Sequence, residues 1–145
     1  MKKIKIVISI LMMVLLIGCT KNEDTKGNFM KVMLETDLSE DYTWTYSVSD
    51  YNIVDIKNID YLSQEDDSTL KSDVEVLTFK ALSEGETDIL IEYTSNQTGE
   101  SKYDLSYILI VDADKNITIS DKSGNYNKEI PDPIIFTNSD DVVEE

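Results

Sequence analysis

The chain has 145 residues, one cysteine and no histidine, and its 29 acidic residues against 13 basic ones give a formal net charge of −16 at pH 7. These counts exclude a Ser-His-Asp triad, a Cys-His dyad, a disulfide within the chain and a Cys/His zinc site. The negative charge disfavours nucleic acid as a partner. The composition therefore favours a protein that is not an enzyme and uses neither a cofactor nor a resident metal, with carboxylate chemistry as the open alternative.

The first residues have the pattern of a secretion signal. Three lysines precede an apolar run over 6–17, which as a helix at ~1.5 Å per residue reaches ~18 Å, short of the ~30 Å hydrocarbon core of a bilayer. The run ends in "LIGC", which resembles the bacterial lipobox. That resemblance implies cleavage before Cys19 and a lipid on its sulfur. An ordinary cleaved signal is the alternative.

These features predict an extracytoplasmic protein that is lipid-anchored to the bacterial cell membrane at Cys19. We expect a lipoprotein signal peptide over 1–18 and a polar tether over 19–28. The tether is polar enough to hold the following domain away from the membrane as a flexible linker.

From residue 28 onward apolar and polar residues alternate with a period of two, which indicates β-strands. The clearest strand is "YTWTYSVS", which places Tyr42, Trp44, Tyr46 and Val48 on one face. Two long alternating segments, 87–94 and 102–111, flank a polar connection that contains Gly99 and are expected to form a hairpin. Weaker strand patterns occupy 28–34, 51–59, 73–81 and 116–120.

About seven short strands separated by turns predict an all-β fold, an immunoglobulin-like antiparallel β-sandwich over 29–120, with an antiparallel barrel as the rival. The acidic segment 62–72 is the longest gap between strands. Residues 121–145 hold both prolines and end in acids. We expect them to form a poorly ordered acidic tail, in which "PIIF" is able to pack back as an edge segment.

Two acidic segments raise the question of a metal. "DADKN" places Asp112, Asp114 and Asn116 at EF-hand spacing, but Ile117 stands where that loop needs glycine. A turn between two strands explains this segment better. Weak calcium binding at residues 65–67 stays open, and a solvated acidic loop is the favoured interpretation.

Three runs, "MLETDLSEDYTWTYSV", "FKALSEGETDILIEYTSN" and "YILIVD", resemble the chagasin-like family of cysteine peptidase inhibitors over about residues 29–112. Members of this family are immunoglobulin-like sandwiches that cover a peptidase's catalytic Cys-His pair with a wedge of three loops. The family's first loop reads N-P-T-T-G before Y-x-W. Its counterpart here is formed by Asp37, Leu38, Ser39, Glu40 and Asp41.

The other two family loops also fall on altered residues. Ser95, Asn96 and Gln97 stand where the family has Arg, Pro and Trp, and the glycine-rich second loop corresponds to 63–72, which has no glycine. The resemblance implies a membrane-anchored inhibitor that occludes a papain-like cysteine peptidase through loops 37–41, 63–72 and 94–100. The alternative is a non-inhibitory binding or structural module of the cell envelope, whose acidic loops dock a basic partner.

Overall fold

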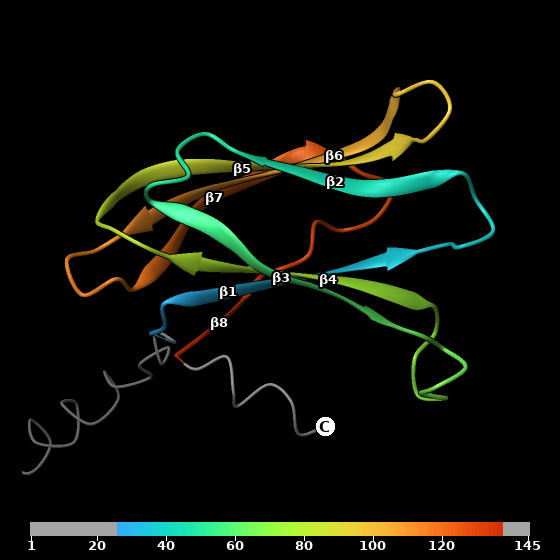
Figure 1. Ribbon diagram of the computed structural model, residues 1–145, viewed down its shortest axis with the longest axis horizontal. Coiled ribbons are helices and arrows are strands. Elements are labelled where there is room, and N and C mark those ends of the chain that lie inside the picture. The colour runs from blue at the N-terminus through green and yellow to red at the C-terminus, as the bar shows by residue number, and fades with distance from the viewer. Residues whose placement is uncertain (1–25, 138–145) are drawn as a thin grey trace, which may run out of the picture.

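The computed structural model describes residues 26–137, which form two β-sheets stacked face to face (Figure 1). Every hydrogen-bonded strand pair is antiparallel. The predicted immunoglobulin-like sandwich is therefore confirmed. The predicted signal peptide over 1–18, the lipid site Cys19 and the last eight residues lie outside the described part of the chain.

Each sheet has four strands. The spatial order of strands is β3-β4-β1-β8 in the first sheet and β2-β5-β6-β7 in the second. The strands are β1 (Phe29–Thr36), β2 (Tyr42–Val48), β3 (Val54–Leu62), β4 (Asp73–Ala81), β5 (Gly85–Ser95), β6 (Ser101–Val111), β7 (Ile117–Asn125) and β8 (Ile134–Phe136). Seven of them match predicted strands, and β8 is the eighth.

The core lies between the sheets and is built from the alternate residues of each strand. On β2, Trp44 is 4% exposed and Val48 is 5% exposed, while Tyr42 and Tyr46 are partly buried against the same cluster. The inward face predicted for this strand is confirmed. Each aliphatic or phenylalanine side chain buried here contributes roughly 1.5–3 kcal/mol relative to an exposed one, so the alternating pattern fixes which face of each strand turns inward.

Residues 121–136 belong to the sandwich, which corrects the domain end predicted at residue 120 and the start of the tail predicted over 121–145. β7 continues to Asn125 along β6. Residues 126–133 then cross from the second sheet to the first (Figure 1). β8 pairs with β1, aligning Phe136 with Phe29, so the edge segment expected in "PIIF" is confirmed.

The reason for this error lies in the composition of the segment. The second half of β7 has no apolar alternation, because its residues 121–125 are partly or fully exposed and β6 supplies the hydrogen bonds that hold it. Both prolines, Pro131 and Pro133, precede β8 and therefore do not interrupt its ladder. Among residues 26–137 no helix is long and apolar enough to cross a membrane.

Candidate partner-binding end of the sandwich

Three connections lie at one end of the sandwich, seen at the right of Figure 1. They are the β1–β2 loop over 37–41, the β3–β4 loop over 63–72 and the β5–β6 loop over 96–100. Because neighbouring strands are antiparallel, every second connection returns to the same end. We call this the loop end. It brings together the three segments that the sequence resemblance marked.

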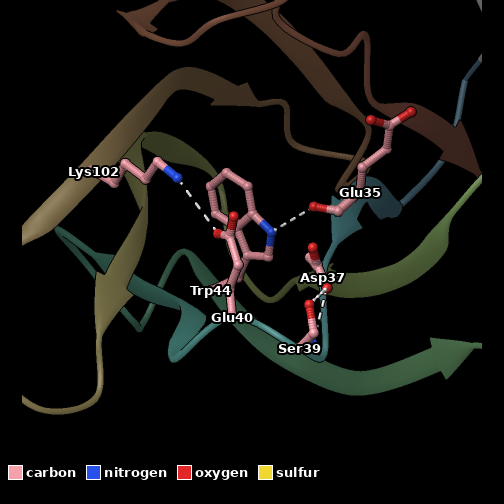
Figure 2. Close-up of polar contacts among 6 residues, drawn as sticks. All are labelled: Glu35, Asp37, Ser39, Glu40, Trp44 and Lys102. Carbon is pink, nitrogen blue, oxygen red and sulfur yellow. Dashed lines mark hydrogen bonds and ion pairs between the residues drawn. The ribbon is translucent and has the colours of Figure 1, made fainter.

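The β1–β2 loop is held by a turn that begins at Asp37. The Asp37 carboxylate accepts hydrogen bonds from the backbone N–H of Ser39, at 2.9 Å, and from the Ser39 hydroxyl (Figure 2). These two bonds lower the pKa of Asp37. Leu38 is left at the tip with 69% of its surface exposed. Leu38 is thus the apolar side chain that this loop presents to solvent.

Asp41 and Asn96 join the first loop to the third. The backbone N–H of Asn96 donates to the carbonyl of Asp41 at 3.0 Å, and its side-chain amide donates to the Asp41 carboxylate at 3.2 Å. The Thr43 hydroxyl donates to the Asn96 side-chain oxygen at 2.9 Å. The hydrogen bonds between these two residues therefore fix the position of the first loop relative to the third.

The β5–β6 loop is organised by Ser95. Its hydroxyl accepts from the N–H groups of Gln97 and Thr98 at 3.2 and 3.3 Å, and its carbonyl accepts from Gly99 at 2.9 Å. Gly99 has a φ of 73°, a conformation that suits glycine. Asn96 and Gln97 are exposed, whereas Ser95 is partly buried.

Glu40 is paired with Lys102, a residue that the sequence analysis did not single out. The Lys102 ammonium lies 3.4 Å from the Glu40 carboxylate, with the two side chains 39% and 40% exposed. The same ammonium lies 5.2 Å from the ring centre of Tyr42 and 5.5 Å from that of Tyr103. Only the antiparallel hairpin brings Lys102 beside the first loop, since 62 residues separate it from Glu40.

The β3–β4 loop adds three acidic residues and one lysine to the loop end. The Asp67 carboxylate accepts from the N–H and the hydroxyl of Thr69, and these bonds lower the pKa of Asp67. Together the three loops carry seven acidic residues against one lysine. No cluster of acidic, histidine or cysteine side chains suited to a metal ion occurs within residues 26–137.

Behind the loops lies a cavity of about 240 Å³ that we call the aromatic pocket. Its wall includes the rings of Trp44, Tyr93, Tyr103 and Tyr126. The indole N–H of Trp44 donates to the carbonyl oxygen of Glu35 at 3.0 Å (Figure 2). This bond satisfies the one polar atom of a residue that is otherwise buried in the core.

Charged side chains also line the aromatic pocket. Glu35 and Glu40 contribute carboxylates, and each is paired with a lysine, Lys128 and Lys102 respectively. Tyr126 and Lys128 belong to the crossover between β7 and β8. The sequence analysis assigned that segment to a tail and so missed both residues.

The sequence matches the model of a known protein family. A family model described as "Chagasin family peptidase inhibitor I42" matches residues 25–111. The chain belongs to the chagasin family of peptidase inhibitors. This confirms the resemblance seen in the sequence, and it places the protein in a family of inhibitors rather than of enzymes. The match ends at the close of β6, so β7, the crossover and β8 lie outside the part that the family model covers.

Among solved structures, the chain is similar to the cysteine protease inhibitor EhICP2 from Entamoeba histolytica. The two are 17% identical, with a TM-score of 0.48, and the similarity covers 58% of this chain and 77% of that one. No curated protein matches the sequence.

Proposed function

We propose that this chagasin family member inhibits papain-like cysteine peptidases by covering their active site with the loop end, and that a lipid on Cys19 holds it at the outer face of a bacterial cell membrane. One observation carries the proposal: the three connections that correspond to the family's inhibitory loops converge at the same end of the sandwich. The inhibitor supplies no chemistry of its own.

The bonds between the loops support a wedge that is formed before binding. Asn96 ties the third loop to the first, and the Lys102–Glu40 pair adds a second link between the same two segments. A loop that is already ordered loses less conformational entropy when it meets its target. Pre-ordering compensates in part for the lack of the arginine and tryptophan that anchor the third loop elsewhere in the family.

Charge favours a particular kind of target. Seven acidic residues against one lysine at the loop end would repel a peptidase with an acidic cleft and attract one with a basic rim. Glu40 is already paired with Lys102, so the first loop presents less negative charge to the catalytic thiolate than its sequence suggests.

Titration of papain with the chain from Thr20 to Glu145, which keeps every described strand, tests inhibition directly. We expect peptidase activity to fall in proportion to the inhibitor added. Leu38→Ser should weaken inhibition about tenfold, because the interface would no longer remove this exposed apolar side chain from water. The matched control is Leu82→Ser, which alters an exposed leucine in the β4–β5 connection at the opposite end.

Two results would argue against inhibition by the loop end. The first is unaltered hydrolysis at micromolar excess of the chain, for papain and for peptidases of the same class with basic rims. The second is an equal effect of the Leu38 and Leu82 variants, since only the former lies at the loop end.

A second candidate function is a non-inhibitory envelope module that docks a basic partner. The acidic surplus of the loop end favours it, because such a surface attracts cationic partners whether or not they are peptidases. Capture from the parent cell's envelope distinguishes the two. A basic partner that elutes at moderate salt, together with no effect on any peptidase tested, would support the module.

A further inference from the structure

The size of the aromatic pocket limits what it can hold. Its volume of about 240 Å³ is several times the ~30 Å³ that one water molecule takes up in the liquid. It is smaller than the ~300–1,000 Å³ of pockets that enclose small-molecule ligands. The pocket therefore suits a single side chain projecting from another protein.

The rings of the pocket make a closed circuit of contacts. Trp44 lies 4.7 Å from Tyr93, Tyr93 lies 6.1 Å from Tyr103, Tyr103 lies 5.4 Å from Tyr126, and Tyr126 lies 6.1 Å from Trp44, measured between ring centres. Tyr93 is stacked against both Tyr42 and Tyr103, and Trp44 and Tyr93 are each 4% exposed, so the partly buried rings of Tyr103 and Tyr126 are the ones that can meet a ligand. Cations are the ligands that the faces of aromatic rings attract.

The charges around the rings also suit a cation. Glu35, Asp37 and Glu40 stand against Lys102 and Lys128 in the pocket wall, which leaves an acidic surplus. In Figure 2 Lys102 and Glu35 are seen on opposite sides of the Trp44 indole, and a dashed line marks the Lys102–Glu40 pair. Lys102 itself rests over the rings of Tyr42 and Tyr103, so this cluster already holds one ammonium group of the chain.

We infer that the aromatic pocket receives an arginine side chain of the partner protein, whose guanidinium packs on the rings of Tyr103 and Tyr126 and competes with Lys102 for Glu40. A guanidinium is preferred to an ammonium because it is planar, weakly hydrated and able to donate to two carboxylate oxygens at once. The chain contains no arginine, so no guanidinium of its own occupies the site.

This inference rests on the proposed function in one respect, that the loop end faces the partner. It adds that the peptidase, or other partner, carries an arginine on the surface that meets the pocket. Because Lys102 closes one side, arginine binding costs the Lys102–Glu40 pair. Removing Lys102 should therefore strengthen binding, whereas loss of a residue that merely supports the fold would weaken it.

The test needs no peptidase. Trp44 is the only tryptophan, so its fluorescence reports on the pocket. N-acetyl-arginine methylamide, titrated against the chain from Thr20 to Glu145, should give a saturable change in the millimolar range. N-acetyl-citrulline methylamide has the same shape without the charge and should give none.

Three variants test which side chains control binding of the arginine probe. Lys102→Met should bind the arginine probe about fivefold more tightly, and Glu40→Gln should bind it about fivefold more weakly. Glu65→Gln removes an equal charge at a position of the β3–β4 loop that does not line the pocket, and it should leave binding unchanged.

A saturable response to citrulline equal to that to arginine, no response to arginine, weaker binding by Lys102→Met, or equal effects of the Glu40 and Glu65 variants would each overturn the inference. The outcome is separate from that of the peptidase titration. Inhibition without arginine binding would refute the pocket's role alone, and arginine binding without inhibition of any peptidase would refute the proposed function alone.

Discussion

Glu75 on β4 is a carboxyl group inside the sandwich. It is 2% exposed and lies opposite Leu34 in the β1–β4 ladder, on a face where Leu34 is fully buried. Burial raises the pKa of Glu75, and a hydrogen bond from Tyr61 partly opposes the increase. The charged form of this side chain is thus less favourable in the folded state than in the unfolded chain.

Replacement of Glu75 by glutamine should raise stability at neutral pH. A raised folded-state pKa means that protonated Glu75 contributes stability in full below the unfolded value of about 4.3, and that this contribution is lost as pH rises through the folded value. The difference in stability between Glu75→Gln and the natural chain should therefore increase as pH rises from 4 and stay constant once the carboxyl is ionised. Thermal midpoints from about pH 4 to pH 8 measure it.

The control for this experiment is Glu86→Gln on β5, an exposed position on which the same substitution should change little. An advantage of Glu75→Gln that does not vary with pH would contradict the argument, because it would then arise from something other than ionisation.

At the scale of elements, the crossover between β7 and β8 decides how the two sheets are joined. The Tyr107 hydroxyl on β6 donates to the carbonyl of Pro131 at 2.8 Å, and the Lys122 ammonium donates to that of Ile130 at 3.1 Å. Burial raises the pKa of Tyr107, so its phenol stays protonated as a donor. These bonds hold the segment that supplies Tyr126 and Lys128 to the aromatic pocket.

Tyr107→Phe should loosen the crossover without breaking the core. It deletes one buried hydroxyl donor while keeping the ring, and a bond of this kind contributes about 1 kcal/mol. We expect a loss of about that size in urea unfolding and faster hydrogen exchange at amides of 126–136. Amides of the β5–β6 hairpin serve as the internal control, and equally faster exchange there would show a general loss of stability instead.

At the scale of the whole molecule, the net charge of −16 opposes contact with anionic lipid headgroups. The proposed membrane association would therefore depend on an attachment outside the sandwich. The proposed lipid on Cys19 would supply it, with the predicted tether over 19–28 between the lipid and the acidic domain.

Cys19→Ser should move the protein from the membrane to the soluble fraction of cells that express it. The serine hydroxyl cannot replace the thiol as the site of lipid attachment, and the acidic domain has no affinity of its own for anionic lipid. Fractionation followed by immunoblotting measures this change. Ser39→Ala lies far along the chain from the predicted signal, so this control variant should stay with the membrane. Membrane retention of the Cys19 variant would refute the lipid anchor.

The sequence by itself determined the sandwich and the inner face of its strands, because burial of alternate residues is a local pattern. Trp44 and Val48 point inward as their spacing requires. The family followed from the same segments. Tertiary structure alone decided what the loop end offers to a partner: the Lys102–Glu40 pair, the bonds of Asn96 to Asp41, and the return of the crossover that brings Tyr126 beside Trp44. These contacts join residues far apart along the chain, and long-range pairing of single polar or aromatic side chains leaves no periodic trace in the sequence.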